Sequence, residues 1–191
     1  DLSMLTSLAD HAAIAIENAM YVKRIQELTI TDDCTSLYKS RYFNYMIDAE
    51  LSRSKRYNYH FALVFFDLHR FKSVNDTHGH LCGSRLLREI GDLIKSHLRD
   101  IDTAYRYGGD EFIIMLPQTN KESAMLVARR LCDLLNQTPI QLEQDVALTI
   151  TASFGVASFP TDATSKVELV RMADQAMYRV KNRTRNGVEG T

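Results

Sequence analysis

Residues 103–116, TAYRYGGDEFIIML, predict the part of the fold from which the rest of the chain can be interpreted. Two short runs that favour extended backbone flank Gly108 and Gly109, a pattern typical of a β-hairpin. Asp110 and Glu111 then stand at the mouth of an apolar run, so two carboxylates open a buried strand. A bend without Cβ atoms lets a bulky ligand approach the backbone, which makes the hairpin a candidate binding site. The alternative is an ordinary turn with solvated acids.

The bulk properties of the chain exclude several classes of protein. Its 191 residues are 45% hydrophobic and 25% charged, enough for one full-size core with an appendage. The formal net charge of −1 gives no electrostatic reason to expect nucleic acid or an anionic membrane as partner. No stretch approaches the roughly 20 apolar residues that span a bilayer, and no signal peptide opens the chain. The three cysteines lack metal-ligand spacing and suit a reducing compartment, so we expect a cytoplasmic location.

Residues 3–29 contain neither glycine nor proline and have helical periodicity. A seam typical of a coiled coil is formed by Leu5, Leu8, Ala12, Ala15, Ala19 and Val22. Residues 31–33, Thr-Asp-Asp, end this pattern with types that suit turns and helix caps. We expect residues 1–30 to be a signalling helix that follows an upstream domain and pairs with a second copy, and residues 31–191 to be a separate domain. The chain would then be a fragment of a longer protein. The alternative is a helix packed on its own domain.

Helical and extended patterns alternate from residue 31 onward. Helices are predicted over 40–56, 86–98, 124–135 and 169–180, and strands over 61–66 and 146–156 in addition to the hairpin. Strict alternation of apolar residues from Val146 to Val156 predicts one strand with one covered face. This order favours an α+β fold in which an antiparallel or mixed sheet has helices on one side, the split βαβ arrangement.

Three acidic residues are predicted to meet at one edge of this sheet. Asp67 ends the first predicted strand, whereas Asp110 and Glu111 lie at the hairpin bend. Crowded carboxylates repel one another unless a cation lies between them, and hard oxygen ligands suit Mg²⁺ or Mn²⁺. Mg²⁺ commonly completes its coordination with substrate phosphates, so a site with few protein ligands is expected.

Further residues suggest a nucleotide ligand. Residues 67–84, DLHRFKSVNDTHGHLCGS, run from the first strand into a helix, and amides at such a turn can hold phosphate with help from Lys72. Asn75 has the paired donor and acceptor needed to read a base edge. Lys181 and Arg185 lie one helical turn apart and could clamp a polyphosphate. A solvated basic helix end would give the same pattern.

Together these segments closely resemble the GGDEF-domain family, the diguanylate cyclases. The resemblance covers about residues 30–187 and rests on DDCTSLYKSRYF, FDLHRFKSVNDTHGH, RYGGDEF, SFGVA and ADQAMYRVKNRTRN, in this order. It implies a ferredoxin-like, nucleotidyl-cyclase palm with a central, mostly antiparallel sheet flanked by helices and preceded by the long N-terminal helix. The stretch LADHAAIAIENAMYVKRIQEL also resembles the closing helix of a GAF domain, which implies an upstream sensor.

The resemblance also assigns roles to individual residues. It implies two Mg²⁺ (or Mn²⁺) ions per active site, held by Asp67, the carbonyl of Leu68, Asp110 and Glu111. Asp110 and Glu111 would be catalytic, with Asp110 as the base for the attacking 3′-hydroxyl. The nucleotide would be bound by Arg70, Phe71, Lys72, Asn75, His80, Ser84, Gly108, Gly109, Lys181 and Arg185. Since one site holds one nucleoside triphosphate and the product contains two nucleotides, a homodimer with facing sites is implied.

Two further comparisons with the family concern regulation and specificity. Arg99 and Asp102 match its RxxD inhibitory site, where the cyclic dinucleotide product binds, although Arg99 could instead be a favourable charge at a helix C-terminus. His69 stands where the family usually has a second Asp, and Thr184 replaces a common Gly. Ser84 replaces an Asp that accepts the N1–H and N2–H₂ hydrogens of guanine. A carboxylate there selects guanine and would oppose the N1 acceptor of adenine.

A serine hydroxyl can donate or accept a hydrogen bond, so Ser84 can face either purine. It is shared with the hybrid promiscuous (Hypr) subgroup, which is associated with cyclic GMP-AMP. We therefore expect an Mg²⁺-dependent dinucleotide cyclase that uses GTP and also ATP and releases pyrophosphate. The alternatives are a strict diguanylate cyclase, in which Ser84 only weakens guanine binding, and a silent receptor for cyclic di-GMP. The presence of all three carboxylates disfavours the receptor, and the absence of a basic groove disfavours a template-directed polymerase.

Overall fold

The structure, a computed structural model, describes residues 4, 7, 11–18, 20–21, 30–143 and 146–191. The chain divides into two compact units, Asp1–Ile30 and Thr31–Thr191. In the first unit, the described residues from 4 to 21 are helical. Leu5, Leu8, Ala19 and Val22 of the expected seam lie outside the described residues, so pairing through this helix stays a prediction. Among the described residues, no helix is both long and apolar enough to cross a membrane.

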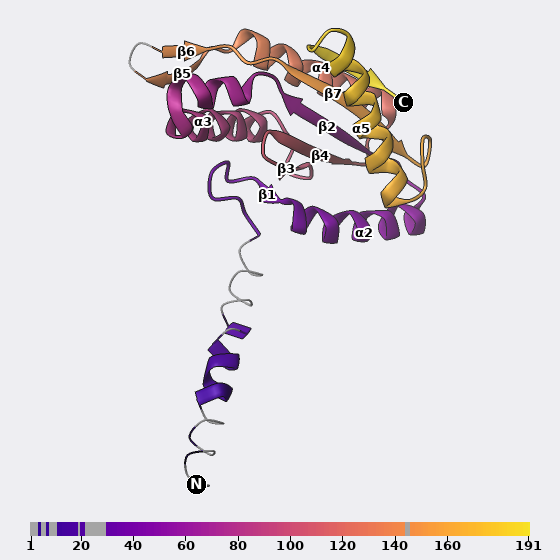
Figure 1. Cartoon of the computed structure of the whole chain (residues 1–191). Coiled ribbons are helices and arrows are strands. Elements are labelled where there is room, and N and C mark those ends of the chain that lie inside the picture. The colour runs from indigo at the N-terminus through magenta and orange to yellow at the C-terminus, as the bar shows by residue number, and fades with distance from the viewer. Residues whose placement is uncertain (1–3, 5–6, 8–10, 19, 22–29, 144–145) are drawn as a thin grey trace. The chain divides into compact units, whose positions relative to one another are not determined.

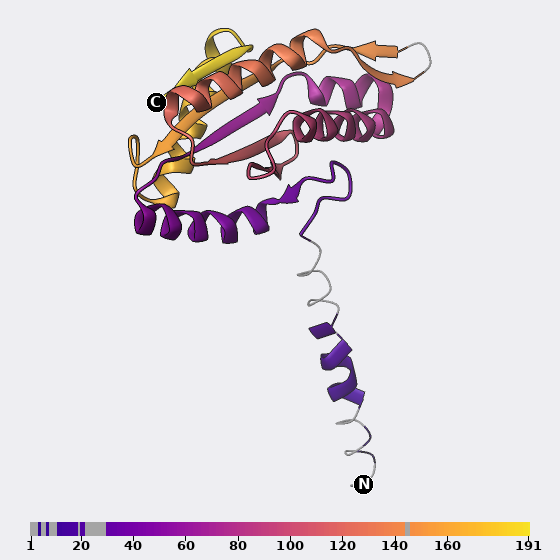
Figure 2. The same cartoon turned by 180° about the vertical axis from the view of Figure 1, so that it is seen from behind.

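The second unit is built on a six-stranded mixed sheet with the order β1-β3-β4-β2-β7-β8, which can be followed in Figures 1 and 2. The strands are β1 (Tyr38–Lys39), β2 (Phe61–Leu68), β3 (Thr103–Gly108), β4 (Glu111–Pro117), β7 (Ala152–Phe159) and β8 (Gly187–Gly190). The central strands pair antiparallel, whereas β1 is parallel to β3 and β8 is parallel to β7. The α+β fold with a sheet flanked by helices is confirmed, and the predicted hairpin is β3–β4.

Helices cover both faces of this sheet, so the expected one-sided arrangement is wrong. They are α2 (Ser40–Tyr57), α3 (Phe71–Ser96), α4 (Lys121–Gln137) and α5 (Lys166–Arg183). Val64 and Phe66 of β2 belong to the cluster that packs with α3 and α4, whereas Leu63 and Phe65 belong to the cluster that packs with α2 and α5. Every residue of β2 and of β7 is buried. A strand buried on both faces reads as a continuous apolar run, which does not reveal how many layers cover it.

The single strand predicted over 146–156 is in fact two. β6 (Val146–Leu148) pairs with β5 (Ile140–Glu143) in a separate two-stranded sheet, and β7 starts at Ala152. Arg85 Nη1 of α3 donates a hydrogen bond to Leu142 O at 2.8 Å, which attaches this small sheet to the helix. The predicted single covered face is also wrong for β7, whose residues are all buried, because the alternating small residues such as Ser153 and Gly155 are covered as well.

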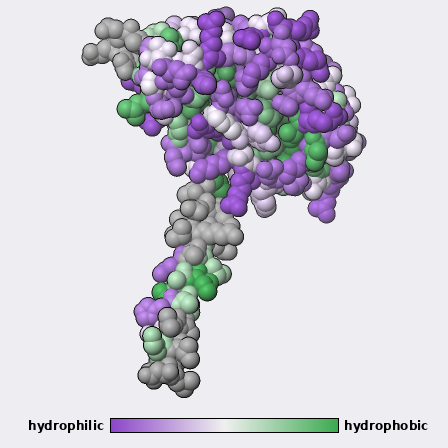
Figure 3. All heavy atoms as spheres, viewed as in Figure 1, coloured by the Kyte–Doolittle hydropathy of each residue, from purple (hydrophilic) through white to green (hydrophobic). Residues whose placement is uncertain are grey.

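Two glycines shape the elements that carry the site. Gly79 has φ 81° and ψ 163° inside α3, a left-handed conformation that kinks the helix between its first turns and the segment predicted from residue 86. Gly155 of β7 lies under α5, where a Cβ atom would be 2.0 Å from Ala173 O. The absence of a side chain there lets α5 pack close to the sheet. Figure 3 shows a mostly hydrophilic face on residues 31–191, with small hydrophobic patches.

Candidate active site

The register of β2 and β4 brings the predicted carboxylates together. Asp67 lies directly opposite Glu111 in the antiparallel pair, so their side chains share one face of the sheet. Leu68 N donates a hydrogen bond to Asp110 O at 3.1 Å. The end of β2 and the hairpin bend are therefore held together by backbone pairing, as the two separated sequence segments predicted.

Gly108 and Gly109 fit a bend that must leave space for a ligand. Gly108 pairs with Glu111 across the turn, which places Gly109 and Asp110 in the two-residue loop. A Cβ atom on Gly108 would lie 3.3 Å from Glu111 Oε2, whereas one on Gly109 would meet no heavy atom within 4 Å. Neither glycine has a left-handed φ, so the backbone of the bend does not itself require glycine at either position.

Arg106 fastens the hairpin turn to the opening segment of the domain. Its Nε and Nη2 atoms donate to Gly109 O at 3.1 and 2.8 Å, and its Nη1 atom donates to Asp32 Oδ1 at 3.1 Å. Burial raises the pKa of Asp32, but hydrogen bonds from Thr35 and Arg106 outweigh it and hold this pKa below its ordinary value. Sequence reasoning missed this clamp, because the 74 residues that separate Asp32 from Arg106 hide the pairing.

Lys181 compensates the negative charge of the carboxylates only in part. Asp67 is 3% exposed, and Lys181 Nζ lies 2.8 Å from its Oδ1 atom. The contact lacks hydrogen-bond angles, so this buried oxygen accepts no hydrogen bond from the described residues. Burial raises the pKa of Glu111, and the nearby charges of Asp67, Asp110 and Asp174 raise it further. Asp174 was not predicted, although its position seven residues before Lys181 on one helix face could have suggested it.

A divalent cation fits these residues. Asp67 Oδ1, which accepts no hydrogen bond from the described residues, could bind it, and the charge of the cation would offset the mutual repulsion of the carboxylates. Within the described part of the chain, no three His, Cys, Asp or Glu side chains form a metal cage by themselves. A magnesium site completed by a backbone carbonyl and substrate phosphates does not need such a cage.

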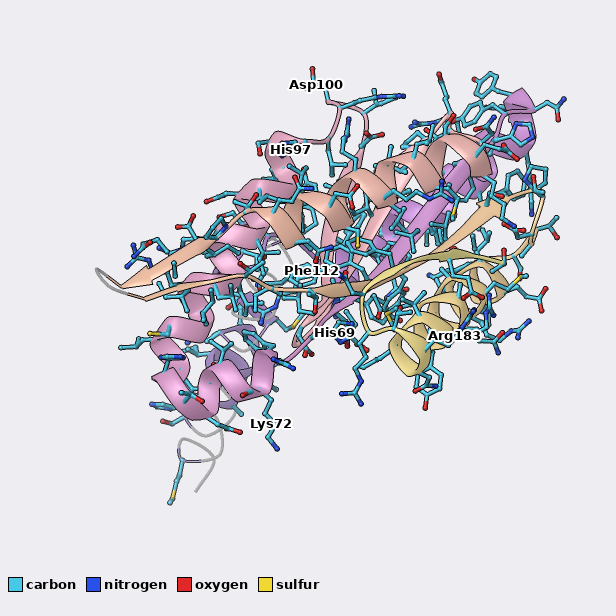
Figure 4. The ribbon with its side chains drawn as sticks, turned by 90° about the horizontal axis from the view of Figure 1, so that it is seen from above. His69, Lys72, His97, Asp100, Phe112 and Arg183 are labelled. Atoms are coloured by element: carbon cyan, nitrogen blue, oxygen red, sulfur yellow. The ribbon has the colours of Figure 1, made fainter. Side chains whose placement is uncertain are left out.

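His69 is a packing residue, not a free acid–base group. It is 7% exposed, and its Nε2 atom lies 2.8 Å from Ser153 Oγ of the neighbouring strand. Burial lowers the pKa of His69, and the charges of Lys181 and Arg185 lower it further against the opposing effect of Asp67. Figure 4 shows His69 after β2 and Lys72 extending outward from the first turn of α3. A buried imidazole therefore stands at the position where the resemblance leads us to expect a second Asp.

A cavity of about 820 Å³ joins the carboxylate edge to the predicted phosphate-binding residues. Its lining includes Asp67, Leu68, His69, Arg70, Phe71, Lys72, Asp110, Tyr178, Lys181, Thr184 and Arg185. Arg70 has φ 61° and precedes the first turn of α3, so the chain turns sharply there and starts the helix beside the cavity. All five predicted phosphate-binding residues thus share one cavity with three of the four predicted metal ligands, whereas Glu111 and the turn glycines do not line it.

The predicted base-binding residues lie outside this cavity, on α3. A Cβ atom on Gly83 would be 1.9 Å from Asn75 Oδ1, so the Asn75 amide rests on Gly83 next to Ser84. Ser84 lines a separate hollow of about 460 Å³, and Cys34 Sγ donates a hydrogen bond to its carbonyl at 3.2 Å. His80 is exposed just after the kink. The contributions of Gly83 and Cys34 could not be read from the sequence.

Arg99 and Asp102 lie together in the loop that follows α3, the loop that carries the His97 and Asp100 labels in Figure 4. Asp102 Oδ2 accepts a hydrogen bond from Arg99 N at 3.0 Å, whereas the buried Oδ1 atom has no hydrogen-bond partner among the described residues. Burial raises the pKa of Asp102, and the charges of Arg99 and Arg130 oppose it. Both loop residues line a cavity of about 280 Å³ that shares no lining residue with the carboxylate cavity.

Comparison with known proteins agrees with this geometry. The family profile "Diguanylate cyclase, GGDEF domain" matches residues 29–187. Diguanylate cyclase A of Treponema denticola is 35% identical over 189 residues, which are 97% of this chain and 50% of that protein. The chain thus spans about half the length of this relative.

Solved structures share the fold. The GGDEF domain of TpbB (YfiN) from Pseudomonas aeruginosa is 30% identical, with a TM-score of 0.80 over 84% of this chain and 93% of that one. The coiled coil and GGDEF domain of DgcB from Caulobacter crescentus, solved in complex with c-di-GMP, is 22% identical with a TM-score of 0.76, over 99% of this chain and 100% of that one. The profile match over most of the domain shows that this chain belongs to the GGDEF-domain family of diguanylate cyclases.

Proposed function

We propose that this chain is an Mg²⁺-dependent dinucleotide cyclase that condenses two nucleoside triphosphates into a 3′,5′-cyclic dinucleotide. The observation that carries the proposal is the paired position of Asp67 and Glu111, with Asp110 hydrogen-bonded to the end of β2, beside a cavity rimmed by lysine and arginine. Carboxylates bind metal ions, and the neighbouring lysine and arginine side chains bind phosphates. Their presence together at the ends of β2 and β4 therefore suits a nucleotide bound with its metal ions. Membership of the diguanylate cyclase family supports the same reaction.

The chain's own residues would position the nucleotide and move one proton. Lys72, Lys181 and Arg185 would hold the β- and γ-phosphates, with amides at the start of α3. Asp110 would accept the proton of the attacking 3′-hydroxyl, whose oxygen forms a bond to the α-phosphorus as the bond to pyrophosphate breaks. Two Mg²⁺ ions, held by Asp67, the Leu68 carbonyl, Asp110 and Glu111, would supply stabilisation of negative charge on the phosphate oxygens.

Two copies of the domain are required, since each site holds one triphosphate and the product joins two. Each nucleotide would attack the α-phosphate of the other across a two-fold axis, releasing two pyrophosphates. Residues 1–30 would pair as a coiled coil and set whether the half-sites meet. A GAF-like sensor would act on them from upstream.

The nucleotide choice follows from Ser84, which lines the hollow on α3. With a hydroxyl in place of a carboxylate, ATP would be accepted beside GTP, and cyclic GMP-AMP would form with cyclic di-GMP. The product would also bind at Arg99 and Asp102, where Asp102 Oδ1 has no hydrogen-bond partner within the described residues. The c-di-GMP complex of the DgcB protein supports product binding by this fold.

The test is product analysis of the purified protein, checked as a dimer, with GTP, ATP and Mg²⁺. We expect both cyclic dinucleotides from the native chain and about a tenfold shift toward cyclic di-GMP for Ser84→Asp, since one charged hydrogen bond distinguishes the bases. An unchanged ratio would refute the role of Ser84. Cyclic di-GMP binding without turnover would favour the receptor alternative, and cyclic di-GMP as sole product would favour a strict diguanylate cyclase.

A further inference from the structure

The hollow beside Ser84 is lined along one face of α3. Leu81, Ser84 and Arg88 are spaced by three and four residues, so they form one stripe on the helix. Arg85 and Glu89 complete the lining of this hollow of about 460 Å³. Its size falls within the usual range for small-molecule sites, about 300–1,000 Å³.

One side of the hollow is apolar and open to solvent. Leu81 is 88% exposed, the most exposed large hydrophobic side chain in the described part of the chain. Three residues further on, Ser84 stands beside Gly83, on which the Asn75 amide rests. An exposed leucine next to hydrogen-bonding side chains suits the face and edge of a purine base, which is flat, apolar on its faces and polar at its rim.

The two arginines of the hollow differ in their partners. Arg85 is engaged, since its Nη1 atom donates to Leu142 O at 2.8 Å. Arg88 forms neither a hydrogen bond nor an ion pair with the described residues. Its guanidinium is exposed, always charged and able to donate several hydrogen bonds in a plane.

We propose that Arg88 is a further specificity-determining residue, which donates hydrogen bonds to the edge of the purine that faces Ser84. This inference rests on the proposed function. An Asp at position 84 would lie four residues before Arg88, in the favourable orientation for an ion pair, and would present acceptors to the base. Ser84 has no carboxylate to pair with Arg88, so the hydrogen-bond donors of Arg88 stay available to the base. Adenine N1 accepts from such donors, whereas guanine presents its N1–H and N2–H₂ groups, so Arg88 weakens the preference for guanine.

Binding of non-hydrolysable GTP and ATP analogues in the presence of Mg²⁺ tests this proposal directly. For Arg88→Gln we expect the ATP analogue to lose about tenfold in affinity, since a charged hydrogen bond is removed, and the GTP analogue to change by less than about twofold. A matched control variant is available: Arg129→Gln removes an exposed arginine on α4, outside the hollow. It should leave the affinity for the ATP analogue unchanged. Equal losses for both nucleotides in Arg88→Gln would overturn the proposal.

A double-mutant cycle adds a second readout. In the Ser84→Asp background, Arg88→Gln should no longer lower affinity for the ATP analogue, because the carboxylate already occupies Arg88 and opposes adenine. Independent, additive effects of the two substitutions would count against the inference. If the native protein formed no cyclic dinucleotide, the proposed function would fail, and the ratio of analogue affinities would still decide whether Arg88 reads the base.

Discussion

The end of the candidate site that we propose binds metal (the metal-binding end) and the end that we propose reads the base (the base-reading end) are built in different ways. At the first end, Asp67 and Glu111 are fixed by a buried antiparallel register, and Lys181 reaches them from α5. At the second end, Ser84 and Arg88 lie on an exposed face of a helix. A change at the metal-binding end disturbs packed strands, whereas a change at the base-reading end alters mainly what the ligand contacts. On the proposed function, the chemistry of this domain would be tied to its core, and its substrate choice would depend on surface residues whose substitution costs little stability.

The largest expected effect tests the metal-binding end. For Asp110→Asn we expect total cyclic dinucleotide output to fall about a thousandfold, because the amide can neither accept the hydroxyl proton nor carry the metal-binding charge. The ratio of the residual products should not change. Product quantification checks both, with thermal unfolding as the control for folding. If Asp110→Asn kept its activity within tenfold of the native chain, Asp110 would not be the catalytic base, and the proposed difference between the two ends would be refuted.

Replacing a glycine by alanine at each end should give smaller effects, on stability at one end and on nucleotide binding at the other. Gly155→Ala, under α5, should lower the free energy of unfolding by about 3 kcal/mol, because the new Cβ atom would meet backbone at 2.0 Å. Gly83→Ala meets only the movable end of the Asn75 side chain, at 1.9 Å. The free energy of unfolding of Gly83→Ala should therefore stay within about 1 kcal/mol of the native value, while its affinity for GTP falls about fivefold.

Urea unfolding measures the stability of the two variants, and binding of a non-hydrolysable GTP analogue measures their affinity for the nucleotide. The comparison between the ends fails if Gly83→Ala destabilises the protein as much as Gly155→Ala does, or if it leaves the affinity for GTP unchanged.

The smallest effect concerns the support of the hairpin turn. The folded-state pKa of Asp32 lies below its ordinary value, so its contribution to stability is present above the unfolded pKa, near 4, and is lost as pH falls through the folded one. We expect Asp32→Asn to lose about 1 kcal/mol at pH 7, from the weakened bond to Arg106, and to converge with the native protein near pH 2. Urea unfolding at several pH values measures this. A difference that stays constant down to pH 2 would show that the carboxylate charge is not responsible.

Much of the local structure could be predicted from the chain. The hairpin around residues 108–109, the strand that ends at Asp67 and the helix over residues 40–56 were predicted within a few residues of their observed bounds. Each has a local signal: a turn sequence, an apolar run or a helical period. The edge strands β1 and β8 and the small β5–β6 sheet have weak signals because they are short and gain their stability from neighbours.

The residues of the candidate site also divide into those that have a local sequence signal and those that do not. Asp67, Asp110, Glu111, Lys72, Lys181, Arg185 and Ser84 could be found from motif and chemistry in the sequence. Gly83 and the Asp32–Arg106 clamp could not, because their partners lie far away in the sequence or across a kink at Gly79. Pairing between distant segments leaves no periodic trace.

By itself the sequence determined the longer helices and the buried strands of the hairpin and of residues 61–66, together with the charged side chains at their ends, since these depend on neighbours a few residues apart. The tertiary structure decided that helices cover both faces of the sheet, that α5 approaches β7 at Gly155, and that Lys181 meets Asp67. These outcomes depend on contacts between residues far apart in the chain, whose energies exist only once the core has packed.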